Sequence, residues 1–180
     1  MKIISKKVTQ MLGLTKSTSP FGSRVHSILN CEYPCRRSNQ LGHITASGLV
    51  ISNSKVLLIF HPYIKRWFQP GGHIDDGDSP IEAAIREVYE ETGYVCEPDS
   101  DDLDPIDIDI HEIPGNPKKG EGVHLHIDLL YHLRVLRQEQ SVEDIKCKWF
   151  VYDEVESIRI QRALAKLAQA IKASNNSVSS

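Results

Sequence analysis

The chain has 180 residues, of which 40% are hydrophobic and 25% charged, and its formal net charge is −3. This length suits one domain with a real core, and the composition excludes a chain that is disordered throughout. The slight acidity argues against binding of duplex nucleic acid but not of a single nucleotide, and no apolar run approaches the roughly 18 residues of a membrane span.

The N-terminal residues and the cysteines bear on the compartment. The first 14 residues contain lysines but no continuous apolar segment, which is atypical of a signal peptide. The four cysteines are scattered and show no second pair at zinc-ligand spacing: Cys31, Cys35, Cys96 and Cys147. We therefore expect reduced thiols and a cytoplasmic protein.

Residues 1–40 precede the main domain and contain two short amphipathic patterns. The first has apolar residues at helical spacing at Ile4, Val8, Met11 and Leu12. The second starts at Pro20 and has them at Phe21, Val25, Ile28 and Leu29. This helical extension could pack on the domain, cover a substrate cleft or form a homodimer contact.

The next segment predicts two paired strands and an aromatic approach to a loop. Residues 44–52 and 55–61 are rich in β-branched and apolar residues and are separated by the turn pair Asn53-Ser54. Trp67 and Phe68 then lead into a glycine-rich loop. These aromatic side chains could hold the loop in place or stack on a base, and both interpretations stay open.

Residues 69–94, QPGGHIDDGDSPIEAAIREVYEETGY, predict a loop followed by a helix. Pro70, Gly71 and Gly72 bar a regular helix and allow sharp backbone angles. A capping box then marks the helix start, with Ser79 at the N-cap, Pro80 at the first position and Glu82 at the third. Gly93 is well placed to end the helix in a left-handed turn.

Three glutamates of this helix, Glu87, Glu90 and Glu91, fall on one sector beside its apolar face. They repel one another by a few tenths of a kcal/mol, roughly, per exposed pair, and Arg86 can offset part of this at Glu90. A solvated acidic surface is the ordinary interpretation of such a cluster. The alternative is a site for a hard divalent cation such as Mg²⁺, which prefers oxygen ligands.

The stretch resembles the signature of the Nudix hydrolases, GX5EX7REUXEEXGU, in which U is aliphatic. The match runs from Gly72 through Asp78 to REVYEETG, which agrees at every fixed position. Two residues depart from the signature. Asp78 replaces the first glutamate, and aromatic Tyr94 replaces the closing aliphatic residue. In the family that first glutamate mainly supports the loop, so the resemblance is little weakened.

The Nudix resemblance implies an α/β/α sandwich with a mixed, curved sheet. It implies a hydrolase acting on phosphoric anhydride bonds, which cleaves the diphosphate of a nucleoside diphosphate linked to another moiety. Glu87, Glu90 and Glu91, with the carbonyl of Gly71, would hold Mg²⁺ or Mn²⁺, and Arg86 would orient a glutamate. Two alternatives on the same fold are a catalytically silent nucleotide sensor and an isomerase of isoprenoid diphosphates.

Two runs of alternating apolar and polar residues follow, at residues 106–111 and 123–129. Each predicts a half-buried strand, and together they predict a hairpin with one face in the core. Their polar positions hold three aspartates and three histidines: Asp107, Asp109, Asp128, His111, His124 and His126.

Histidines two residues apart on a strand point the same way, so His124 and His126 share the polar face. They could contact phosphate, transfer a proton or bind a second metal, or they could only pair with the neighbouring aspartates. His73 and His61 could join them in a folded cleft. We take Trp67, His73, His124 and His126 as candidate substrate-binding residues.

The C-terminal part predicts a last strand at residues 146–152 and a helix at residues 161–171. Glu143 lies six residues before Trp149, where similar Nudix enzymes carry an acidic residue near the metal, so Glu143 or Glu91 is the candidate general base. A solvated loop glutamate is the alternative. The predicted division is an N-terminal extension at 1–40, the hydrolase domain at 41–173 and a disordered tail at 174–180.

Overall fold

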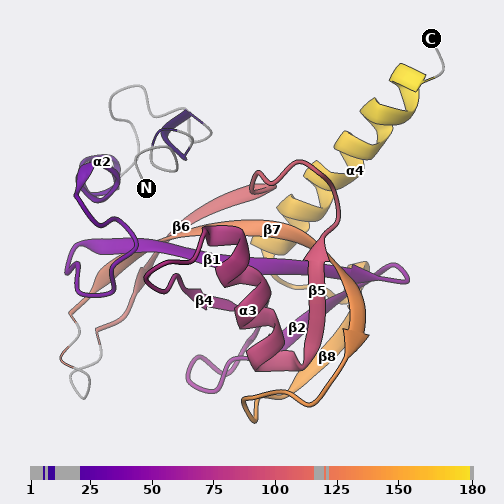
Figure 1. Cartoon of the computed structure of the whole chain (residues 1–180), viewed down its shortest axis with the longest axis horizontal. Coiled ribbons are helices and arrows are strands. Elements are labelled where there is room, and N and C mark those ends of the chain that lie inside the picture. Colours follow the sequence, from indigo (N-terminus) through magenta and orange to yellow (C-terminus); the bar gives the residue numbers. More distant parts are fainter. Residues whose placement is uncertain (1–5, 7, 11–20, 116–119, 121, 179–180) are drawn as a thin grey trace.

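The structure is a computed structural model, and it describes residues 6, 8–10, 21–115, 120 and 122–178 (Figure 1). The elements, in chain order, are α2 (Gly22–Asn30), β1 (Gly42–Ser52), β2 (Lys55–Phe60), β3 (Trp67–Phe68), β4 (Gly71–His73), α3 (Pro80–Thr92), β5 (Tyr94–Pro98), β6 (Asp107–Ile113), β7 (His124–Gln138), β8 (Cys147–Val151), the 3-10 turn η2 (Tyr152–Glu154) and α4 (Ile158–Val178).

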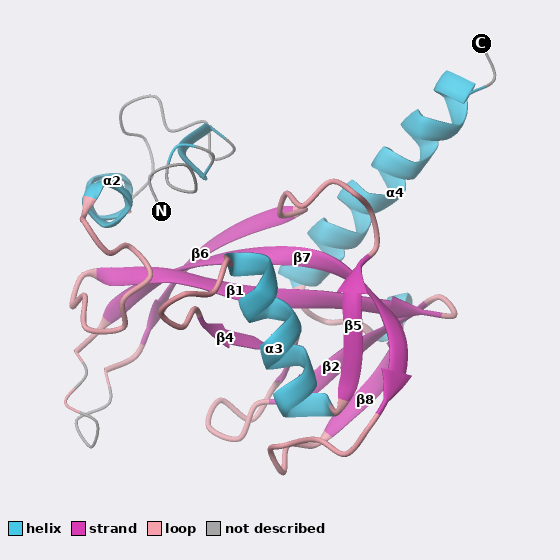
Figure 2. Cartoon of the chain, in the orientation of Figure 1, coloured by secondary structure: helices cyan, strands magenta, loops and turns pink. Residues whose placement is uncertain are grey.

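All eight strands form one mixed sheet. The main order is β3-β2-β1-β7-β5, with β4 also paired to β1, β6 to β7 and β8 to β2. The long pair β1–β7 is parallel and the other pairs are antiparallel. Figure 2 shows α3 crossing one face of this sheet, while α4 begins on the other side and extends away from the sheet. The predicted α/β/α architecture with a mixed sheet is confirmed.

The predicted hairpins are also present. β1 and β2 pair antiparallel, and the turn residues Asn53 and Ser54 have φ of 50° and 59°. Two successive residues with positive φ match the right-handed twist of the flanking strands, which explains this tight turn. β6 and β7 pair antiparallel over the whole of β6, so that Ile110 lies opposite Ile127.

The centre of the sheet, formed by β1 and β7, is buried on both of its faces. Leu125, Ile127 and Leu129 pack in the larger apolar cluster, which includes Val88 of α3. Leu130 points to the opposite face of the sheet and packs in a second apolar cluster, which includes Ile160 of α4. The expectation that β7 is only half-buried is therefore wrong, because α4 covers the polar face and both sides of a strand so placed lose contact with water.

The N-terminal extension packs on the domain where the structure describes it. Val25, Ile28 and Leu29 of α2 are buried, and with Val8 they belong to the larger apolar cluster. Packing was the first of the three uses expected for this segment. The expected first helix falls largely outside the described residues, because Ile4, Met11 and Leu12 are among the undescribed ones.

α4 is longer than predicted, because it begins at Ile158 and runs to Val178. The prediction that the chain is disordered from Ser174 is therefore wrong for residues 174–178. Once the first turns of a helix are formed, each further residue adds at little free-energy cost. Residues 179–180 lie outside the described part. Within the described residues, no helix combines the length and apolarity that crossing a membrane requires. All four cysteines are free thiols.

Candidate active site

The helix that carries the glutamates is fixed at both ends as its sequence predicts. Ser79 Oγ accepts a hydrogen bond from the backbone N–H of Glu82, and the Glu82 carboxylate accepts one from the backbone N–H of Ser79 at 2.8 Å. Gly93 closes α3 in the left-handed conformation, with φ of 74°. These caps set the rotation of α3, and hence the direction in which its carboxylates point.

Glu87 and Glu91 face the glycine loop at β4. Glu91 is only 9% exposed, and its carboxylate accepts a hydrogen bond of 2.9 Å from the N–H of Gly71. The Glu87 carboxylate lies so close to Gly72 that a Cβ at that position would sit 2.6 Å from Glu87 Oε2. Gly72 therefore allows the backbone to approach the Glu87 carboxylate directly, whereas the missing Cβ of Gly71 leaves room for Ser47 of β1.

Arg86 joins the helix to the loop. Its guanidinium donates hydrogen bonds to Asp78 at 3.1 Å, Glu87 at 2.9 Å and Glu90 at 3.1 Å, and to the carbonyl of His73 at 2.9 Å. Burial alone would lower the pKa of Arg86, but the bonds to Asp78 and Glu87 outweigh it and the pKa is raised. Asp78 is thus long enough to meet Arg86 and to support the loop.

The carboxylates are electrostatically strained in the absence of a cation. Burial, and after it the charges of Glu87, Glu143 and Glu90, raise the pKa of Glu91 to about 8, against the opposing hydrogen bond from Gly71. Burial also raises the pKa of Glu87. Carboxyl groups that resist ionisation beside other carboxylates suit a divalent cation with oxygen ligands, so these residues fit Mg²⁺ or Mn²⁺.

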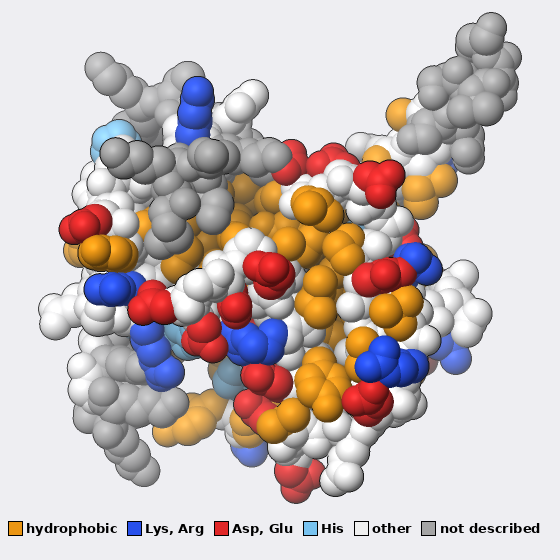
Figure 3. All heavy atoms as spheres, in the orientation of Figure 1, with side chains coloured by type: hydrophobic (Ala, Val, Ile, Leu, Met, Phe, Trp, Pro, Cys, Tyr) orange, Lys and Arg blue, Asp and Glu red, His pale blue; other side chains and the backbone are white. Residues whose placement is uncertain are grey.

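Glu143 lies beside this group although it is 52 residues further along the chain than Glu91. Its backbone N–H donates a hydrogen bond of 2.8 Å to the carbonyl of Glu90. Its charge contributes to the raised pKa of both Glu87 and Glu91. Figure 3 shows acidic and basic side chains interleaved over α3 on this face of the molecule, with histidine side chains in a hollow next to them.

A second polar group lies on the sheet face opposite α3 and consists of imidazoles. His43 of β1 lies opposite His126 of β7, which in turn lies opposite His111 of β6. His73 and His124 complete the group. The ring centroid of His43 lies 4.7 Å from the centroid of His126, 5.0 Å from that of His73 and 5.3 Å from that of His124. The structure thus brings together three sequence-predicted residues, His73, His124 and His126.

His43 was missed by the sequence reasoning, and His61 was wrongly grouped with the others. His43 sits in a run of apolar and small residues, where a single histidine gives no periodic signal, although the alternation His43-x-Thr45-x-Ser47 marks a polar face of β1. The ring of His61 lies near Phe68, and its Nδ1 accepts hydrogen bonds from the N–H groups of Tyr63 and Ile64.

The expected pairing of histidines with aspartates holds only for His111, whose Nδ1 lies 3.0 Å from Asp109. The other aspartates of this face are bound by cations of α4 and by β1. Arg162 and Lys166 contact Asp107 at 2.5 Å each, and Arg159 pairs with Asp128, which also accepts hydrogen bonds from Thr45 and Ser47. The sequence pattern could not show this, because α4 is distant in the chain.

Trp67 lies at the edge of the sheet and is half-buried. Its ring packs edge-on against Phe60 and Phe150, at centroid distances of 5.3 and 4.9 Å. These contacts fit the interpretation that Trp67 holds the approach to the loop.

Comparison with known proteins places this geometry in a family. The model of the family described as "NUDIX domain" matches residues 42–171. The chain belongs to the NUDIX family. The resemblance expected from REVYEETG is therefore confirmed, and the match extends well beyond the signature to all eight strands of the sheet and most of α4.

One NUDIX relative is a Lactococcus lactis protein described as "Probable DHNTP pyrophosphohydrolase", which is 36% identical over 102 residues. The match covers 57% of this chain and 60% of the relative. An Escherichia coli relative, "Phosphatase NudJ", is 34% identical over 58 residues, which is 31% of this chain and 38% of the relative.

Two solved structures share the NUDIX fold. A NUDIX hydrolase from Nitrosomonas europaea superposes with a TM-score of 0.52 at 20% identity, covering 71% of this chain and 88% of that one. A UDP-X diphosphatase superposes with a TM-score of 0.53 at 17% identity and covers 93% of both chains. At these identities the likeness supports the fold alone.

Proposed function

We propose that this NUDIX protein is a Mg²⁺- or Mn²⁺-dependent hydrolase of phosphoric anhydride bonds, which cleaves the diphosphate of a nucleoside diphosphate linked to another moiety. The observation that carries the proposal is the gathering of Glu87, Glu90 and Glu91 at the glycine loop, with Glu91 buried and its pKa raised to about 8. The names of the NUDIX relatives, a pyrophosphohydrolase and a phosphatase, support the same class of bond.

The residues that would hold the cation are Glu87, Glu90, Glu91 and the carbonyl of Gly71. A cation bound there would neutralise the diphosphate and lower the pKa of a coordinated water. Arg86 keeps Glu87 and Glu90 in place through its hydrogen bonds, which makes it a positioning residue. The N–H of Gly71 holds the carboxylate of Glu91 in the same way.

Glu143 or Glu91 acts as the general base. Both carboxylates belong to the same electrostatic group, since the charge of Glu143 contributes to the raised pKa of Glu91. Glu143 is exposed and can reach a water on the solvent side, whereas Glu91 is buried at the loop.

Trp67, His73, His124 and His126 form the proposed substrate-binding set. The histidines lie on β4 and β7, and His73 belongs to the same strand, β4, as Gly71, whose carbonyl would hold the cation. The partly exposed ring of Trp67 is the aromatic surface on which a base could stack. The free thiols agree with the cytoplasm as the compartment, and a homodimer contact remains a proposal.

The two alternatives are less well supported. A silent sensor has no need for a complete glutamate set held by Arg86. An isoprenoid isomerase would use a cysteine in the site, but Cys96 is 4% exposed within the larger apolar cluster. Burial raises its pKa to about 12, which does not suit a reactive thiol.

The test is a hydrolysis assay on nucleoside triphosphates, dinucleoside polyphosphates and nucleotide sugars with Mg²⁺, with phosphate release coupled to a pyrophosphatase. Glu91→Gln keeps the size and helix propensity of the side chain and removes one charge. We expect kcat to fall roughly 10²-fold or more, with an unchanged or slightly raised melting temperature.

Glu156→Gln is the matched control, because Glu156 is exposed and lies outside the site. It should keep full activity. A stable Glu91→Gln protein with wild-type turnover would remove Glu91 from the mechanism, and a chain inactive on every substrate class would favour the sensor.

A further inference from the structure

The imidazole group on the sheet face away from α3 has the composition of a metal site. His43, His73 and His126 come from three adjacent strands, β1, β4 and β7, so their backbone positions are fixed by the hydrogen bonds of the sheet. One ring nitrogen from each of the three lies within 4.8 Å of the others. Side chains placed by strands form a more precise site than side chains placed by loops.

These distances are close to what a bound cation requires. Imidazole nitrogens bind zinc at about 2.0–2.1 Å, so that three nitrogens on one tetrahedral zinc lie about 3.4 Å apart. The three nitrogens lie within 4.8 Å of one another, so rotations about the side-chain torsions would have to bring them to that spacing.

The imidazole group is partly buried, and His43 and His124 are almost fully buried. His43 is 1% exposed, and His126 Nε2 is buried with no hydrogen-bond partner among the described residues. A buried polar atom of this kind destabilises the folded protein unless another group or an ion binds it. A neutral imidazole nitrogen of this kind can bind a metal.

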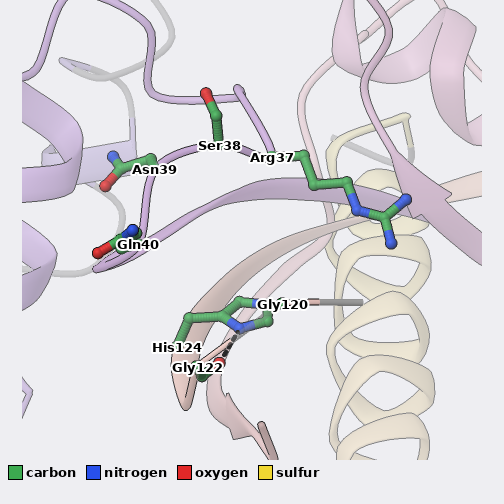
Figure 4. Close-up of a pocket in the computed structure, with 7 residues that line it drawn as sticks. All are labelled: Arg37, Ser38, Asn39, Gln40, Gly120, Gly122 and His124. Carbon is green, nitrogen blue, oxygen red and sulfur yellow. Dashed lines mark hydrogen bonds between the residues drawn. The ribbon is translucent and has the colours of Figure 1, made fainter. Parts of the chain in front are cut away.

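His124 provides the approach from solvent. A cavity of about 390 Å³ is lined by His124, Gly122 and the segment from Arg37 to Gln40. Figure 4 shows His124 across the cavity from that segment, with its Nδ1–H donating to the carbonyl of Gly122 at 2.8 Å. This bond fixes the tautomer and leaves Nε2 as an acceptor, the arrangement usual around metal-binding histidines.

We propose that His43, His73 and His126 bind a transition-metal cation of the class that prefers imidazole, for which Zn²⁺ is the probe. The fourth position faces His124 and the cavity and is filled by water or by His124 Nε2. This site is distinct from the carboxylates of α3, since oxygen ligands select Mg²⁺ or Mn²⁺ whereas imidazoles select zinc and its neighbours. It does not depend on the proposed hydrolysis, although His73 and His126 would then contact the substrate through the bound cation rather than directly.

The test is calorimetric titration of the EDTA-treated full chain with Zn²⁺ in excess Mg²⁺, which occupies the carboxylates. Wild type should bind one equivalent. His126→Gln should weaken binding roughly 100-fold or more, whereas His26→Gln, which alters an exposed residue of α2, should not change it. Glu91→Gln should also leave zinc binding unchanged.

NMR of the wild-type imidazoles keeps the test valid even if a variant does not fold. Zn²⁺ should shift the ring signals of His43, His73 and His126 and leave those of His26 in place. Absence of saturable binding to wild type, unchanged affinity in His126→Gln, or zinc binding lost in Glu91→Gln would each overturn the proposal.

Discussion

The environment of Glu91 makes its ionisation unfavourable when no cation is bound. Glu91 is 9% exposed, and its carboxyl lies beside Glu87 and Glu90 and receives one hydrogen bond, from the N–H of Gly71. Without a cation, burial and the neighbouring charges outweigh that bond and raise its pKa to about 8. An ionised Glu91 therefore destabilises the metal-free protein, and this gives a measurable dependence on pH.

The first prediction concerns that dependence. Between its ordinary pKa and about 8, folded Glu91 keeps a proton that the unfolded chain has released. The free energy of unfolding of the metal-free protein should therefore fall as pH rises through this window, by at most about 1.4 kcal/mol per pH unit from this group. Denaturant unfolding in EDTA at several pH values measures it.

The range above pH 6.5 is the cleanest for this measurement. His126, whose pKa is lowered from its ordinary value of 6.5, adds the opposite slope below that pH. Glu91→Gln should flatten the decline between pH 6.5 and about 8, and Glu156→Gln should retain it. Equal slopes in wild type and Glu91→Gln would show that Glu91 ionises normally.

Single residues were predictable where a local pattern carried them. Glu87, Glu90, Arg86 and Asp78 follow from the spacing of one helix and its loop, and all four meet in the structure. His43 was not predictable, because its partners come from other strands and only the register of the sheet brings them together.

Among the elements, the short strand β4 has the greatest influence on the site. Gly72 of β4 lies opposite Ala46 of β1, and its missing Cβ leaves the space that the Glu87 carboxylate uses. The carboxylate is the end of a flexible side chain, so an added methyl group would displace Glu87 without forcing the backbone apart.

The second prediction follows from this contact. Gly72→Ala should leave the melting temperature near the wild-type value but raise the Mg²⁺ concentration needed for half-maximal activity by roughly 10-fold or more, because Glu87 is displaced. Gly122→Ala is the matched control, since an added Cβ there meets nothing within 4 Å. A Gly72→Ala protein with normal Mg²⁺ dependence would remove Glu87 from the ligand set.

Helices and hairpins were predicted more reliably than their burial. The capping box and Gly93 fix α3 locally, so both of its ends follow from sequence. The burial of β7 on both faces depends on α4, whose Arg159, Arg162 and Lys166 neutralise aspartates far away in the chain. Contacts of that kind have no local signature.

At the scale of the whole molecule, cations should stabilise the fold by linkage. A ligand present at a hundredfold excess over its Kd stabilises the folded state by about 2.7 kcal/mol, which is several degrees of melting temperature for a domain of this size. The third prediction is that saturating Mg²⁺ or Mn²⁺ raises the melting temperature of wild type and fails to do so in Glu91→Gln.

Scanning calorimetry of the EDTA-treated protein, with and without added nucleotide, measures the shift. Glu156→Gln should respond like wild type. A melting temperature that stays constant at millimolar metal under both conditions would count against cation binding at the carboxylates.

The pairing of β4 with β1 also constrains how this loop can change its length. Three consecutive residues, Gly71, Gly72 and His73, alternate between the two sides of the sheet, so that Gly72 meets Glu87 while His73 meets His43. An insertion or deletion of one residue would exchange these sides and misplace the carboxylate and imidazole groups together. Homologous chains that contain both groups should therefore tolerate substitutions around this strand but no change in its number of residues.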